Sequence, residues 1–189
     1  MIFNNKNKVE EDFEFPDDKT RWAALLRGQV LTATTQKYFN FINLADQKSQ
    51  AMIILNSVLI PFILTWVGKP GFGFAATISL IAAIASIFAA IISIYPRRRA
   101  GVKPDGTRNL LHFSDVSQLT EDEFLNEFLP VYNDASQLSE VAIKDLHDMA
   151  RRIIKPKYFW LKISYGVFFI GNLIAVAFAL FALWTDGVH

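Results

Sequence analysis

The chain has 189 residues, of which 52% are hydrophobic and 20% are charged, and its formal net charge is +1. This near-neutral balance argues against a nucleic-acid partner, because duplex binding usually shows as a clear basic excess. The absence of cysteine excludes a disulfide scaffold and a cysteine-based zinc or redox site, and three scattered histidines do not indicate a metal centre.

Three stretches of the sequence lack Asp, Glu, Lys and Arg, and each is long enough to cross a bilayer. They comprise 20, 27 and 23 positions, at 49–68, 70–96 and 163–185. Crossing about 30 Å of hydrocarbon takes roughly 20 apolar helical residues. Because backbone groups in lipid must satisfy their own hydrogen bonds, each stretch is predicted to be a helix. The predicted fold is all-α: an integral membrane protein with three transmembrane helices and a small cytoplasmic helical domain.

The segment before the first apolar stretch divides into two parts. Residues 1–20 are acidic, with little periodic apolar content, and predict a flexible N-terminal arm. Residues 21–48 carry apolar side chains at three- and four-residue spacing, which predicts a helix leading into the membrane. Asp46 and Lys48 lie just before the first span. Either they mark the headgroup boundary, or they act as coupling residues by pairing with another cytoplasmic segment.

The predicted spans, 49–68, 73–95 and 163–185, contain a few polar residues. Asn56 and Asn172 are costly in hydrocarbon, so each is expected to face another helix. Ser79 and Ser86 belong to a row of small residues in the second span that permits close helix packing, either within one chain or between subunits. Asn56, together with a serine and a proline in the first span, leaves a second topology open, in which this stretch is a buried hairpin partner.

Residues 97–162 are predicted to form the cytoplasmic helical domain. Thr120 and Glu123 have the spacing of a capping box, and predict a short helix that ends at Pro130. A second helix is predicted from about Leu138 to Lys155, because apolar residues recur with a 3.6-residue period up to Pro156.

The distribution of Lys and Arg predicts the topology. Seven lie before the first span, one lies between the first two spans, eleven lie between the second and third, and none follows the third. The positive-inside tendency therefore places the N-terminus and residues 97–162 in the cytoplasm and the C-terminus outside.

The sequence contains no catalytic motif, and no enzymatic activity is expected. Its most informative charged feature is a pair of arginine clusters. The first cluster, beside the second span, contains Arg97, Arg98, Arg99 and Arg108, together with Lys103. It binds either anionic headgroups or a phosphate, for which Arg offers paired donors. Arg151 and Arg152 are a second phosphate-binding candidate, and their alternative is a solvated helix face paired with Asp148.

Four short motifs occur in order along the chain. They are Ala-Asp-Gln-Lys-Ser at 45–49, Tyr-Pro-Arg at 95–97, Asn-Leu-Leu-His-Phe at 109–113 and Lys-Tyr-Phe-Trp-Leu at 157–161. Together they resemble the transmembrane effectors of the bacterial Pycsar antiphage systems, over roughly residues 35–185.

The resemblance implies a membrane effector that responds to cUMP or cCMP made by an adjacent cyclase. Such an effector impairs the bacterial inner membrane in an abortive-infection response, with the N-terminus cytoplasmic and the C-terminus periplasmic. We expect the phosphate to be held by some of the six arginines, with Phe113 or Tyr132 stacking on the base, and the chain to act as a homo-oligomer in the lipid bilayer without a further cofactor. The alternative is a constitutive membrane scaffold or partner-binding protein without nucleotide gating.

Overall fold

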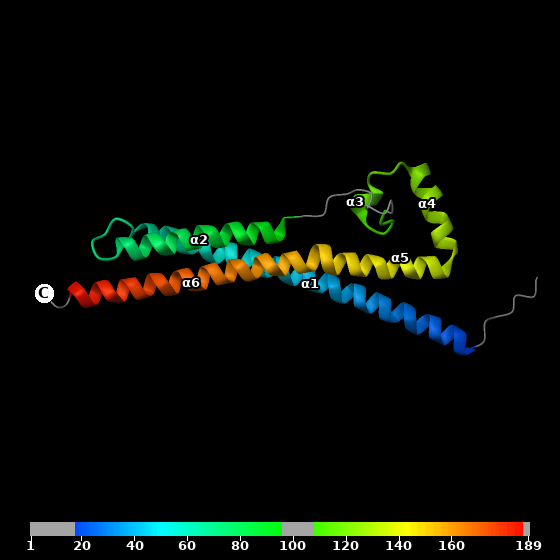
Figure 1. Ribbon diagram of the computed structural model, residues 1–189, viewed down its shortest axis with the longest axis horizontal. Helices are drawn as coiled ribbons and strands as arrows, with labels where there is room; N and C mark the ends of the chain where they lie inside the picture. Colours follow the sequence, from blue (N-terminus) through cyan, green and yellow to red (C-terminus); the bar gives the residue numbers. More distant parts are fainter. Residues whose placement is uncertain (1–17, 96–107, 187–189) are drawn as a thin grey trace, which may run out of the picture.

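The computed structural model describes residues 18–95 and 108–186, and every regular element in those two ranges is a helix, which confirms the predicted all-α fold. The elements are α1 (Asp18–Leu64), α2 (Gly73–Ile94), α3 (Phe113–Val116), α4 (Glu121–Asn133), α5 (Ala135–Asp148), a π-helical segment (Met149–Ile154) and α6 (Lys155–Asp186). Three helical stretches are long and apolar enough to span a membrane. Figure 1 shows an elongated molecule, with α2 and α6 side by side at one end and α3 and α4 at the other.

α1 is a single helix of 47 residues, about 70 Å long, and therefore more than twice the length needed to cross the hydrocarbon core. It begins at Asp18, so residues 18–20 belong to this helix and not to the predicted arm, whereas residues 1–17 lie outside the described ranges. It ends at Leu64, four residues before the predicted end of the first span. Residues 65–72 form turns, in which Gly71 adopts a φ of 79° that favours glycine.

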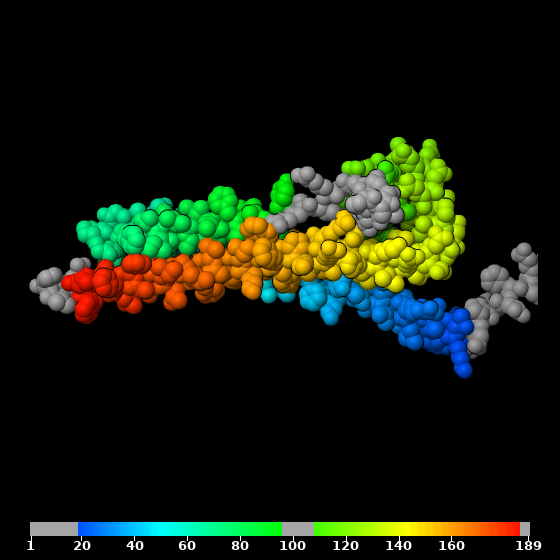
Figure 2. Space-filling model, in the orientation of Figure 1, coloured from blue at the N-terminus to red at the C-terminus, as the bar shows by residue number. Residues whose placement is uncertain are grey.

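The membrane bundle consists of residues 45–64 of α1 together with α2 and α6. Its interior is built from small side chains: Ala83 and Ala90 are at most 1% exposed. Its outer face carries large apolar side chains such as Phe88 and Leu173, which are 63% and 72% exposed. An outer surface of this kind suits lipid and would be a liability in water. Figure 2 shows α2 and α6 in continuous contact on the face viewed.

α2 and α6 approach most closely at Gly171. A Cβ atom added there would lie 2.2 Å from the Cβ atom of Ala82, far inside van der Waals contact. A Cβ atom added at Gly166, five residues earlier on α6, would meet nothing within 4 Å. The absence of a side chain at position 171 therefore sets the separation of the two helices.

The head, residues 108–148, contains α3, α4 and α5. The capping box predicted for Thr120 and Glu123 is confirmed: Thr120 N donates to Glu123 Oε2 at 2.9 Å, and Glu123 N donates to Thr120 Oγ1 at 3.3 Å. The backbone hydrogen bond from Thr120 holds the pKa of the Glu123 carboxyl below its ordinary value.

The prediction that this helix ends at Pro130 is wrong, because α4 continues to Asn133. Three rings at four-residue spacing pack along one face of α4. Phe128 lies 5.1 Å from Phe124 and 5.9 Å from Tyr132 between ring centroids. This row of ring contacts extends past Pro130 and supports the last turn, in which a proline removes only one hydrogen bond.

The prediction of a helix end at Pro156 is also wrong. α5, the π-helical segment and α6 follow one another without a break. In a regular α-helix the ring of Pro156 would meet the carbonyl of Arg152. Here Lys155 N donates to Ala150 O, five residues back, so a wider turn precedes the proline and accommodates it. The head is thereby joined to the third membrane helix without a loop.

Candidate functional site

The residues expected to bind a nucleotide fall into three groups. Arg97, Arg98 and Arg99 lie outside the described residues. The head carries Arg108, Phe113 and Tyr132. The π-helical segment carries Arg151 and Arg152.

In the head, both candidate aromatic rings are available for stacking. Phe113 is 78% exposed and stacks on His112 with ring centroids 5.0 Å apart, and Tyr132 is 60% exposed at the end of α4. Arg108 Nη1 lies 3.8 Å from Glu127 Oε1, which ties it to α4. Exposed rings of this kind can accept a base, and the guanidinium lies on the same part of the molecule.

In the π-helical segment, the two arginines differ. Arg152 Nε lies 3.5 Å from Asp148 Oδ1, and Asp148 is buried, so this guanidinium is engaged by its own helix. Arg151 is exposed. π turns are frequent at functional sites, since they reorient side chains within a helix.

A buried polar cluster fastens the start of the head to α5. Asn109 Nδ2 donates to Asp145 Oδ1 at 2.6 Å, and Asn109 N donates to Asp115 Oδ2 at 3.1 Å. Asn109 and Asp115 are 5% and 4% exposed. The chain that leaves the second membrane helix is therefore anchored on the helix that leads into the third.

A second polar site ties the three long helices together where the membrane bundle begins. The Lys157 ammonium on α6 forms an ion pair with Asp46 on α1, and it also lies 3.5 Å from the carbonyl of Ile94 at the end of α2. Tyr158 Oη donates to Phe41 O at 3.3 Å on α1. Asp46 thus contacts another segment, whereas Lys48 is exposed. The Lys157 side chain is 13% exposed and that of Asp46 is 29% exposed, so the pair is partly desolvated.

The four polar residues expected to pack membrane helices form two pairs. Asn56 Nδ2 on α1 donates to Ser86 Oγ on α2 at 3.2 Å. Ser79 Oγ on α2 donates to Asn172 Oδ1 on α6 at 2.7 Å. Each side chain therefore links two helices of one chain.

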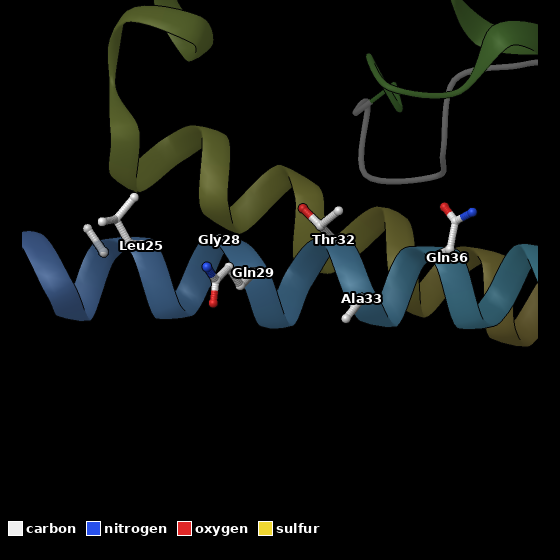
Figure 3. Close-up of a pocket in the computed structure, with 7 residues that line it drawn as sticks. Leu25, Gly28, Gln29, Thr32, Ala33 and Gln36 are labelled. Carbon is white, nitrogen blue, oxygen red and sulfur yellow. The ribbon is translucent and has the colours of Figure 1, made fainter.

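Two surface grooves in the described residues, one on α1 and one between α2 and α6, are lined by none of the nucleotide candidates. Figure 3 shows a groove along α1 whose seven lining residues all belong to that helix and include none of the nucleotide candidates: Ala24, Leu25, Gly28, Gln29, Thr32, Ala33 and Gln36. In the same two ranges, no group of three or more His, Cys, Asp or Glu residues is placed to hold a metal ion.

Comparison with known families decides the identity of the chain. Residues 30–184 match the family model of the Pycsar effector protein domain, which covers most of the chain. The chain belongs to the Pycsar effector family. The Pycsar effector is accordingly a membrane effector of an antiphage system, as the four sequence motifs implied. No curated protein and no solved structure matches it significantly.

In this Pycsar effector, sequence reasoning missed the partners of the residues it selected. The motif at 157–161 does not identify Lys157 as the partner of Asp46. Ser164 is not among the predicted site residues, although Ser86 Oγ donates to its carbonyl and its own hydroxyl donates to the carbonyl of Ser86. A basic residue next to a proline at the start of an apolar stretch was the available signal for Lys157. No local signal distinguishes Ser164 from a serine that faces lipid.

Proposed function

We propose that the effector is activated by a cyclic pyrimidine nucleotide, cUMP or cCMP, made by a partner cyclase. Once activated, homo-oligomers impair the integrity of the bacterial inner membrane and the infected cell dies. The excess of Lys and Arg on one side of the spans supports a cytoplasmic N-terminus and head and a periplasmic C-terminus. With this topology the head lies in the compartment where a cyclase releases its product.

The observation that carries this proposal is the ion pair between Asp46 and Lys157. It lies at the end of the membrane bundle nearest the head, and it ties α6 to α1 while the same ammonium reaches the end of α2. Because α5 continues into α6 through the π-helical segment, a change in the head moves Lys157 directly. A ligand shifts such an equilibrium only if it binds one arrangement more tightly than the other.

The nucleotide is expected to contact the head and the π-helical segment. Arg108 and Arg151 offer guanidinium groups for the phosphate, and Phe113 or Tyr132 offers a ring for the base. Arg97, Arg98 and Arg99 belong to the same proposal. Arg152 joins the site if the nucleotide displaces it from Asp148, and Lys48 and Asp46 are the proposed coupling residues.

The replacement Arg151→Ala with Arg152→Ala is expected to weaken nucleotide binding roughly ten- to hundredfold. Because Arg152 is held by Asp148, the variant is expected to lose about one hydrogen bond to a charged group, worth about 1.5–3 kcal/mol, and tenfold in affinity corresponds to about 1.4 kcal/mol. Calorimetric titration of the purified protein with cUMP and cCMP measures this change. Lys155→Ala, which removes an exposed cation from the next turn, is the matched control and should bind as the native chain does. Unchanged affinity in the double variant would remove both arginines from the site.

The function itself is tested in vesicles that contain the purified protein. Addition of cUMP or cCMP is expected to collapse an imposed membrane potential, read with a voltage-sensitive dye, while the matching linear monophosphate leaves it unchanged. The constitutive scaffold predicts no response to any nucleotide. Absence of depolarisation with both cyclic nucleotides therefore rejects the gating proposal.

A further inference from the structure

The interior of the membrane bundle contains buried polar side chains at a regular spacing. On α2, Ser79, Ser86 and Ser93 are seven residues apart and at most 9% exposed. On α1, Ser49 and Asn56 are also seven residues apart, and both are 0% exposed. Seven residues are nearly two helical turns, so each set lies on one face of its helix, in steps of about 10 Å.

Hydrogen bonds between the helices show that these faces meet in layers. In the middle layer, Asn56 donates to Ser86, and Ser86 and Ser164 bond each other's carbonyl at 3.0 and 2.9 Å. In the next layer, Ser93 Oγ donates to Lys157 O at 2.9 Å.

The register of the helices places the remaining members. Ser49 is seven residues before Asn56, and Ser93 is seven residues after Ser86, so in the antiparallel pair of α1 and α2 they occupy the same level. The pair Ser79 and Asn172 forms the third layer. We call these three layers the polar ladder: Ser49 with Ser93, Asn56 with Ser86 and Ser164, and Ser79 with Asn172.

The polar ladder extends across most of the membrane. From Ser79 to Ser93 it covers 14 residue steps of α2, or about 21 Å of a hydrocarbon core that is about 30 Å thick. At one end it meets the ion pair of Asp46 and Lys157.

Two oxygen atoms of the ladder have no hydrogen-bond partner among the described residues. They are Ser49 Oγ and Asn56 Oδ1, and both belong to fully buried side chains. An unsatisfied buried polar atom costs about 1–3 kcal/mol, and more where no water reaches it. Packing between helices would need no such atoms. Oxygen acceptors of this kind bind water and hard cations.

We propose that the polar ladder is the hydrated path by which small monovalent cations cross the bilayer in the active effector. In the structure Asn56, Ser86 and Ser164 bond one another, Ser79 bonds Asn172, and the ion pair of Asp46 and Lys157 closes one end. When the pair separates, the helices move apart, and water and cations replace the bonds between Asn56, Ser86 and Ser164. This inference rests on the proposed function, because it assigns the route of the depolarisation.

Because the chain has no cysteine, single cysteines test this route directly. Ser49→Cys, Ser86→Cys and Ser93→Cys place a thiol in the ladder. Ser57→Cys, next to Asn56 on the exposed side of α1, is the matched control. Vesicles containing each full-length variant are exposed to the cationic 2-(trimethylammonium)ethyl methanethiosulfonate and to its anionic sulfonatoethyl analogue. Membrane potential is recorded in the same vesicles, with and without cUMP or cCMP.

The nucleotide that depolarises the vesicles should also make the cationic reagent modify the ladder cysteines at least tenfold faster. Modification at position 57 should change less than twofold, and the anionic reagent should react at least tenfold more slowly with the ladder. If the vesicles depolarise while the ladder cysteines stay unmodified, the inference is overturned and the proposed function stands. The polar ladder would then serve helix packing only.

If neither nucleotide depolarises the vesicles, the proposed gating fails and the variant Asp46→Lys decides the route instead. This replacement sets two ammonium groups against each other and opens the bundle without a ligand. A cation leak with modified ladder cysteines then supports the path. A leak in which the ladder cysteines stay unmodified, or the absence of a leak, overturns the proposed path.

Discussion

Asp46→Lys is expected to depolarise the membrane without any nucleotide. In the native chain Asp46 forms an ion pair with Lys157, and the replacement turns this attraction into repulsion between two partly buried ammonium groups. Unit charges about 4 Å apart at an effective dielectric constant near 20 interact by roughly 4 kcal/mol. Screening at side chains that are 13% and 29% exposed reduces the expected change to about 2 kcal/mol, or roughly thirty-fold in the ratio of closed to open protein.

The measurement is dye-reported membrane potential and colony count after induced expression in cells without a cyclase. The control is the exchange Asp46→Lys with Lys157→Asp, which restores a pair of opposite sign and should return both readings towards those of the native chain. Equal leak from the single and the exchanged variant would contradict the role of the pair, since a misfolded chain leaks whichever charge it carries.

Gly171→Ala is expected to destabilise the membrane bundle by about 2 kcal/mol. The added methyl group would lie 2.2 Å from the Cβ atom of Ala82, so α2 and α6 must move apart along their closest contact. Overpacking of a tight interface typically costs about 1–3 kcal/mol. Reversible unfolding in mixed detergent micelles, followed by circular dichroism, measures the difference.

Two companion variants make this result specific to the helix contact. Adding Ala82→Gly removes the Cβ atom with which the new methyl group clashes, and should recover most of the lost stability. Gly166→Ala places the same methyl group on the same helix where nothing lies within 4 Å, and it should be neutral or gain up to about 1 kcal/mol from helix propensity. If alanine at position 166 lowers the stability as much as alanine at position 171, the close approach of α2 is not the reason that α6 requires glycine.

The prolines show where reasoning from local sequence failed. Pro130 and Pro156 were both expected to end helices, because a proline removes a hydrogen bond and its ring clashes with the preceding turn. At Pro130 the row of aromatic rings on α4 supports one more turn, and at Pro156 the π turn widens the helix ahead of the proline ring. Both effects depend on residues other than the proline, which a rule based on the proline alone does not take into account.

The candidate site divides in the same way. Residue type predicted the arginines, the aromatic rings and the buried amides, since phosphate, bases and hydrocarbon each impose a recognisable requirement. Their partners followed from neither type nor spacing. Asp46 and Lys157 are separated by 111 positions in the chain, and Ser86 and Ser164 by 78.

The sequence alone determined that the chain is helical, crosses the membrane and belongs with the Pycsar effectors. Apolar length, charge distribution and short motifs are local properties, and lipid allows almost no other backbone structure. Only the tertiary structure decided which polar groups meet inside the bundle. That outcome depends on the register of antiparallel helices, which is set by contacts such as Gly171 against Ala82, and a shift of one residue would turn each serine of the polar ladder by about 100° away from its partner.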